Sequence, residues 1–144
     1  MKAATARFQF DCHGIDWQEL ERLFEAGNLG GRKGNKVRRA FENSQVVCFV
    51  TDKQRLIGAG RALTDGEYHG VIYDIVVHPE HQRQGIGLQL VKQIIERLPV
   101  WRIMLVADTD VQPFYAKIGF RPYADVMARL DQDRLYDTLP RGPA

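Results

Sequence analysis

The chain has few cysteines, no marked excess of charge and no long apolar run. Only Cys12 and Cys48 occur among 144 residues, outside any C-x-x-C pair. They are expected to be reduced thiols, which excludes a disulfide framework. The 20 basic and 18 acidic residues leave a formal net charge of +2. Such a balance requires neither nucleic acid nor an anionic membrane as a partner.

We expect neither a membrane anchor, nor an export signal, nor an internal division in this sequence. No apolar stretch approaches the roughly 20 residues that span a bilayer, and the N-terminus has no apolar signal-peptide core. Repeats, low-complexity tracts and linkers are absent as well. We therefore expect a single cytoplasmic domain over residues 1–144, a length that buries roughly two thirds of the unfolded surface.

Hydrophobic periodicity divides the chain into alternating helices and strands. Helices are expected at residues 16–26, with Asp16 as N-cap, and at 35–43, 85–97 and 111–118. Strands are expected at 46–50, 55–63, 71–77 and 101–106, with one or two closing strands in 120–130. This order predicts an α/β fold, a mixed sheet with helices on both faces.

The most informative segment reads Gln82-Arg83-Gln84-Gly85-Ile86-Gly87, between an apolar strand and a helix. A helix N-terminus presents unpaired N–H groups and a positive dipole end, which together bind phosphate. The two glycines lack Cβ, so that a pyrophosphate can approach the backbone, and the arginine adds a cation at the rim. Glycines also end strands for purely structural reasons, so that this pair alone leaves both interpretations open.

Two other phosphate-binding motifs do not fit this segment. A Walker loop requires Lys and then Ser or Thr after its second glycine, whereas Leu88 and Gln89 follow Gly87. A dinucleotide fingerprint requires a third glycine, and Leu90 stands at that place.

Two separated motifs make the chain resemble the GNAT family of N-acetyltransferases over most of its length. The first is the strand Ile72-Tyr73-Asp74-Ile75-Val76-Val77, followed by His78-Pro79 and Gln82-x-x-Gly85-x-Gly87. The second is Phe114-Tyr115-x-x-x-Gly119-Phe120. The resemblance implies the GNAT fold, in which a mostly antiparallel sheet splays between its fourth and fifth strands. These correspond here to residues 71–77 and 101–106.

The resemblance also implies acetyl-CoA as co-substrate, with pantetheine in the gap between the splayed strands. Pantetheine amides would pair with the backbone of Ile75 and Val77, while the pyrophosphate reaches the amides from Arg83 to Leu88. The cofactor-binding residues that follow are Ile75, Val76, Val77, Gln82, Arg83, Gln84, Gly85, Ile86, Gly87, Leu88, Asp108 and Phe114. Asp108 stands where many relatives have a cofactor-binding Asn, and its alternative role is to cap the following helix. The alternative for Phe114 is a core position.

The implied chemistry is direct attack of a neutral amine on the thioester carbonyl. A backbone N–H near Val76 or Val77 would hold the oxyanion. Tyr115 would protonate the leaving sulfur, because a phenol is protonated at neutral pH. The alternative for Tyr115 is a packed aromatic residue.

The candidates for the general base lie in the strand expected at residues 71–77. Asp74 is a carboxylate in an apolar strand, and burial without a partner is costly. One hypothesis is that it orients a water or the amine; the other is a structural bond to a neighbouring loop. Alternation places Val71, Tyr73, Ile75 and Val77 on one face and Asp74 on the other, unless a bulge intervenes. Tyr73 would contact substrate or carry a proton, or else be an ordinary strand aromatic.

Within the family, the chain resembles small bacterial and plastid enzymes of the serotonin N-acetyltransferase type. The likeness rests on Gly60-Arg61-Ala62-Leu63-Thr64-Asp65-Gly66 and on the Tyr73-Asp74 step. It implies a small-molecule primary amine as acceptor. Glucosamine-phosphate acetyltransferases fit less well, because they carry an acidic residue at the place of Val106. A protein N-terminal or lysine acetyltransferase and a non-catalytic acyl-CoA-binding module are the alternatives. The sequence allows a homodimer and does not require one.

Acceptor recognition is expected from residues 28–36 and 123–127. The first segment and the following helix carry a basic cluster, Arg32, Lys33, Lys36, Arg38 and Arg39. This cluster would attract an acidic substrate or the cofactor phosphate, or else form a solvated helix face. The four histidines, His13, His69, His78 and His81, show no metal-ligand spacing, and no metal is expected.

Overall fold

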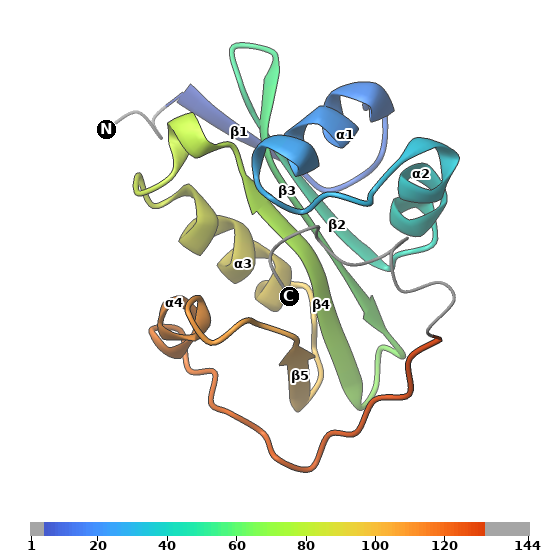
Figure 1. The fold of residues 1–144 in the computed structure, drawn as a ribbon, viewed down its shortest axis with the longest axis vertical. Helices are drawn as coiled ribbons and strands as arrows, with labels where there is room; N and C mark the ends of the chain where they lie inside the picture. The colour runs from blue at the N-terminus through green and yellow to red at the C-terminus, as the bar shows by residue number, and fades with distance from the viewer. Residues whose placement is uncertain (1–4, 132–144) are drawn as a thin grey trace.

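The computed structural model describes residues 5–131, which form one five-stranded sheet with helices on both faces (Figure 1). The strand order is β1 (Ala6–Gln9), β2 (Val46–Asp52), β3 (Arg55–Thr64), β4 (His69–Val77) and β5 (Arg102–Leu105). The helices are α1 (Trp17–Ala26), α2 (Gly34–Glu42), α3 (Ile86–Glu96) and α4 (Gln112–Ala116), with a 3-10 turn, η2, at Pro79–His81. All neighbouring strands are antiparallel except β4 and β5, which are parallel. The predicted fold class is confirmed.

The alternation of β2 divides the core into two apolar clusters. Cys48 and Val50 pack with the buried side chains of α3, while Val47 and Phe49 pack with those of α1 and α2. Successive strand residues point to opposite faces, so a central strand with both faces covered becomes apolar throughout. The sheet is therefore a two-sided platform with α3 on one face and α1 and α2 on the other.

The start of α1 follows the sequence prediction. The carboxylate of Asp16 accepts hydrogen bonds from the backbone N–H groups of Gln18 and Glu19, over 3.0 and 3.2 Å. Such a cap stabilises a helix by about 1 kcal/mol. None of the helices within residues 5–131 is long and apolar enough to cross a membrane.

The closing strands expected in 120–130 are not formed, and the first strand, β1, was not predicted. Residues 121–131 are exposed and contain no strand. Their large apolar residues are Tyr123, Val126, Met127 and Leu130. This spacing is not the alternation of a strand, and Pro122 removes one donor from any ladder. The four residues of β1 are too few to give a periodic signal.

A β-bulge interrupts β4 and corrects the predicted alternation. Ala59 pairs with Val76 and Arg61 with Tyr73, which leaves two residues of β4, Asp74 and Ile75, opposite Gly60. Asp74 takes the left-handed conformation, with φ 60°. A bulge of this kind shifts the face of every following side chain.

The faces of the side chains follow from this bulge. Ile75 and Val77 join the α3 cluster. Tyr73 and Asp74 instead meet Arg61, which also lies over Phe41 of the α1–α2 cluster. The expectation that Tyr73 shares a face with Ile75 and Val77 is therefore wrong. A Cβ built on Gly60 would meet Ile75 Cδ1, the far end of a flexible side chain, so a larger residue there requires Ile75 to shift.

The pairing of β4 with β5 is short. It covers His69 to Ile72 of β4, ending at Leu105 of β5, whereas β4 continues to Val77. The second half of β4 therefore has an edge that β5 leaves unpaired, as the predicted splay requires.

Candidate functional site

The unpaired edge of β4 presents the backbone of Ile75 and Val77. The N–H of His78 donates to Ile57 O on β3 over 2.7 Å. Neighbouring strand residues direct their polar groups to opposite edges, so Val77 and Ile75 direct N–H and C=O away from β3. One of these groups has a partner, because Gln82 Nε2 donates to Val77 O over 2.9 Å.

The turn after η2 opens α3 without a side-chain cap. Arg83 and Gly85 have φ values of 62° and 84°, and Gly85 is the N-cap. The N–H of Gln89 donates to Gly85 O over 3.1 Å. Within residues 5–131 the preceding N–H groups, those of Ile86, Gly87 and Leu88, have no acceptor. Three aligned donors at the positive end of a helix dipole form an anion-binding geometry.

Phe114 of α4 lies between the start of α3 and the end of β4. A Cβ built on Gly87 would be 3.5 Å from Phe114 Cζ and 3.6 Å from Val77 Cγ2. The fold therefore brings together Val77, Gly87 and Phe114, three of the residues predicted to bind the cofactor. Phe114 also packs against the apolar cluster on the α3 face.

Tyr115 packs against two aromatic neighbours, and its hydroxyl has no hydrogen-bond partner among the described residues. Its ring centroid lies 5.0 Å from that of Phe114 and 5.8 Å from that of Phe120. Burial raises the pKa of the phenol above its ordinary value. No hydrogen bond joins its hydroxyl to any residue in 5–131. The group is thus a neutral donor at physiological pH.

Asp108 does not cap α4 through its side chain. The N-cap of α4 is Val111, which makes no side-chain cap bond. The backbone O of Asp108 accepts from the N–H groups of Val111 and Gln112, over 3.0 and 3.1 Å. The capping alternative is therefore wrong, and the exposed carboxylate of Asp108 remains available for other contacts.

The carboxylate of Asp74 is bound by two arginines and is only 5% exposed. Its Oδ1 accepts from Arg32 Nε and Nη2, over 3.0 and 2.6 Å, and its Oδ2 accepts from Arg61 Nε over 2.8 Å. Arg32 belongs to the loop between α1 and α2. Asp74 thus ties that loop to β4, as the structural alternative expected. Sequence reasoning did not single out Arg61, although a charged residue within an apolar strand is a usable signal.

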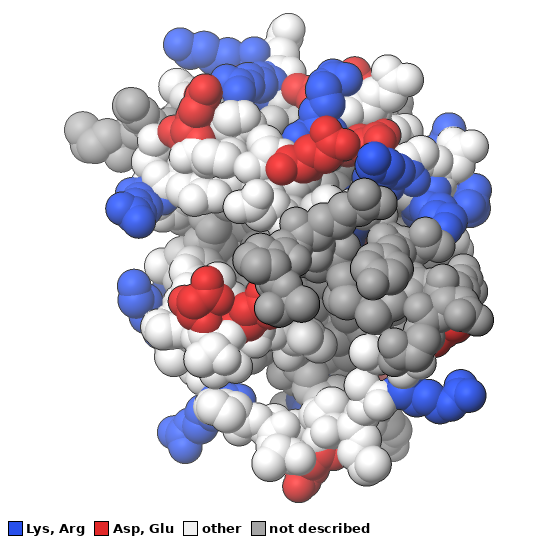
Figure 2. Space-filling view, in the orientation of Figure 1, with Lys and Arg blue, Asp and Glu red and all other residues white. Residues whose placement is uncertain are grey.

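The basic cluster is divided by the fold. Arg32 turns to Asp74, while Arg38 pairs with Glu42 one helical turn away, over 3.2 Å. Basic and acidic side chains are interspersed on the surface seen in Figure 2, in the region of α1 and α2. The exposed residues of this cluster therefore form an ordinary solvated helix face, not a patch of positive charge alone.

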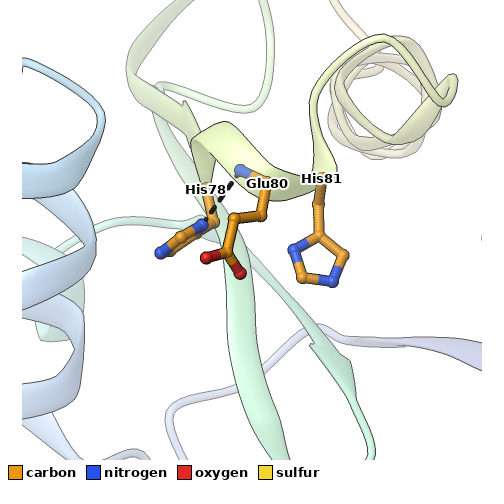
Figure 3. A group of neighbouring side chains, drawn as sticks. All are labelled: His78, Glu80 and His81. Carbon is orange, nitrogen blue, oxygen red and sulfur yellow. Dashed lines mark hydrogen bonds between the residues drawn. The ribbon is translucent and has the colours of Figure 1, made fainter.

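Three side chains of the η2 turn gather in a way that their sequence spacing did not suggest. His78, Glu80 and His81 each offer a ligand atom within 4.8 Å of the others (Figure 3). His78 Nδ1 accepts from the N–H of Glu80 over 3.1 Å. Arg55 lies 3.2 Å from Glu80 Oε2 and 3.1 Å from His78 Nε2. The guanidinium of Arg55 on β3 thus contacts two of these three side chains, and these contacts link β3 to the turn that precedes the anion-binding loop.

Comparison with known proteins agrees with this geometry. Residues 11–120 match the model of the Acetyltransferase (GNAT) family. An uncharacterized N-acetyltransferase ycf52 of Pyropia yezoensis is 34% identical over 113 residues, covering 74% of this chain and 65% of that protein. A histone acetyltransferase TAP1 of Glycine max is 30% identical, and a chloroplastic serotonin N-acetyltransferase 2 of Oryza sativa is 31% identical. Each match covers 74% of this chain, with 52% and 57% of those proteins.

The chain thus spans half to two thirds of the length of these relatives. A putative acetyltransferase of Deinococcus radiodurans has the same fold, with a TM-score of 0.80 and 23% identity, over 100% of this chain and 98% of that one. The family match covers most of the residues that build the site. The chain belongs to the GNAT family of acetyltransferases.

Proposed function

We propose that this chain transfers an acetyl group from acetyl-CoA to the primary amine of a small molecule, by direct attack in a ternary complex. The observation that carries the proposal is the uncapped first turn of α3 beside the unpaired edge of β4. One presents donors for a diphosphate and the other presents strand backbone for amides. Acetyl-CoA carries both groups, because its diphosphate is joined to a pantetheine arm that contains amides and ends in the thioester.

The binding residues follow from this fit. The N–H groups of Ile86, Gly87 and Leu88 would hold the pyrophosphate, with Arg83 at the rim. The backbone of Ile75 and Val77 would pair with pantetheine as an added strand does. Gly87 has no side chain of its own, so its backbone can be approached closely.

Two groups suit the acyl-transfer step. The amine nitrogen forms a bond to the thioester carbon, the C–S bond breaks, and the thiolate takes a proton from Tyr115. The amine proton passes to solvent. Of the two expected oxyanion donors, Val77 directs its N–H to the unpaired edge, whereas Val76 is turned to β3. We therefore assign the oxyanion to the Val77 N–H.

Asp74 and Tyr73 are assigned to the acceptor side of the site. Both oxygens of Asp74 already accept from guanidinium groups, so we infer that Asp74 positions its neighbours and does not carry the proton. Tyr73 is 37% exposed and lies under Arg61, which suits contact with the acceptor.

A protein acetyltransferase is the second candidate, because the soybean relative carries that name. A thiol-release screen with acetyl-CoA against amines, aminosugars, amino acids and peptides separates the two, with Tyr115→Phe run in parallel. We expect turnover with small amines that the variant loses. Turnover with peptides alone would favour the second candidate. Binding of CoA without thiol release for any acceptor would make the chain a binding module.

A further inference from the structure

Arg61 has hydrogen-bonding capacity that the protein does not use. Its side chain is 16% exposed, yet of the five N–H groups of a guanidinium only two have acceptors. Nε donates to Asp74 Oδ2 over 2.8 Å, and Nη1 donates to Ser44 Oγ over 3.3 Å. The other three N–H groups have no acceptor within residues 5–131. Nη2 is nevertheless open to solvent, unlike buried unpartnered atoms such as Arg102 Nε.

Arg61 is a mostly buried cation. Its only described acidic partner within residues 5–131, Asp74, also accepts from Arg32, so this carboxylate is shared between two guanidinium groups. These side chains are mostly buried, with exposures of 23% for Arg32, 16% for Arg61 and 5% for Asp74. Interactions of such groups are less screened than those of surface charges. An anion that reaches Arg61 therefore gains more than it would on an exposed helix.

Arg61 lies beside the point where the sheet opens. It is the cross-strand partner of Tyr73, the residue that follows the last β4–β5 pair. Its guanidinium carbon lies 5.2 Å from the centre of the Tyr73 ring. The bulge turns Tyr73 and Asp74 to the α1–α2 face, where the guanidinium of Arg61 also lies over the Phe41 ring. An acceptor that approaches the unpaired edge from this face meets Arg61.

We propose that Arg61 binds a carboxylate of the acceptor, so that the preferred substrates are amines that also carry an acidic group. The inference rests on the proposed function. The Nη1 and Nη2 atoms form a planar fork that matches a carboxylate, while Asp74 holds Nε and fixes the orientation of the fork. The positive charge of the Arg61 guanidinium itself disfavours polycationic peptides as acceptors.

The test compares each amino acid of a short series with its carboxamide. Glycine, β-alanine and γ-aminobutyrate and their amides are assayed by thiol release from acetyl-CoA, with rates corrected to the neutral amine. We expect kcat/KM to favour at least one carboxylate over its amide by roughly tenfold or more, the range of a charge-assisted hydrogen bond. In Arg61→Gln the preference falls to near unity, while Arg61→Lys retains part of it.

Arg97→Gln is the matched control. Arg97 also stacks on an aromatic ring, that of Phe10, but packs beside α3 on the opposite face, so this variant should keep the wild-type preference. Equal use of each acid and its amide by the wild type would overturn the proposal, even if Arg61→Gln does not fold. A weakened Kd for CoA in Arg61→Gln, with the acid preference kept, would also overturn it. No turnover with any amine would refute the proposed function itself.

Discussion

Gln82 donates a hydrogen bond from its side-chain amide to the carbonyl oxygen of Val77, over 2.9 Å. This bond joins the turn that opens α3 to the unpaired edge of β4. The two surfaces proposed for the diphosphate and for pantetheine are thereby held at a fixed separation. Such preorganisation lowers the ordering cost of binding a flexible arm.

Replacement of Gln82 by Glu should weaken acetyl-CoA binding. The change removes the donor to Val77 O and places a carboxylate beside a carbonyl and near the proposed diphosphate site. We expect the Kd for CoA, measured by isothermal titration calorimetry, to rise by roughly tenfold, since a lost bond of this kind costs about 1–2 kcal/mol. Gln89→Glu makes the same change in charge on the exposed side of α3 and should leave the Kd near wild type. An unaltered Kd in Gln82→Glu would show that the bond has no part in binding.

The two glycines of the turn should respond differently to alanine. Gly85 has φ 84°, so Gly85→Ala should lower the free energy of unfolding by about 1–2 kcal/mol. Gly87 lies within α3 and a Cβ there meets only ordinary contacts, so Gly87→Ala should preserve or slightly raise the stability. Gly87→Ala should instead raise the Kd for CoA by crowding the diphosphate. Urea unfolding and calorimetry separate the two effects, and equal loss of affinity and stability at both positions would contradict this assignment.

Local signals explain why much of the site could be predicted from sequence. The cap of α1 by Asp16 depends on neighbouring residues only, and so does the left-handed turn at Gly85. The Phe114-Tyr115 motif likewise sits on its expected short helix.

The surroundings of Asp74 could not be predicted, because they depend on residues distant in sequence. The bulge places Ile75 against Gly60 across the sheet, and Arg32 reaches Asp74 from 42 residues away. Strand periodicity contains no information on either contact. The closing strands are a different case, because the apolar residues of 121–131 do not alternate and Pro122 lacks an N–H donor.

Tyr115→Phe should lower kcat by roughly a hundredfold and leave the Kd for CoA unchanged, because only the proton donor is lost. Tyr68→Phe, which removes an exposed hydroxyl away from α4, is the control and should have wild-type kcat. A kcat within twofold of wild type in Tyr115→Phe would remove the phenol from the mechanism.

The pH dependence of stability provides a second test of Tyr115. Burial raises the pKa of its phenol, so the folded state favours the neutral form. The associated stabilisation is complete below the ordinary pKa of about 10 and is lost as pH rises through the folded value. Tyr115→Phe should therefore lose less stability than wild type above pH of about 10, as measured by urea unfolding. Parallel curves would contradict the burial of the neutral form.

Asp74→Asn separates the positioning role from that of a general base. Loss of the charge leaves Arg32 and Arg61 without their buried partner, which should lower the free energy of unfolding by about 2–4 kcal/mol. Glu42→Gln, which breaks the exposed pair with Arg38, should cost less than about 0.5 kcal/mol. We expect KM for the acceptor to rise, because Arg61 loses its orientation, while the pH profile of kcat keeps its acidic limb. Disappearance of that limb with an unchanged acceptor KM would show instead that Asp74 takes the proton.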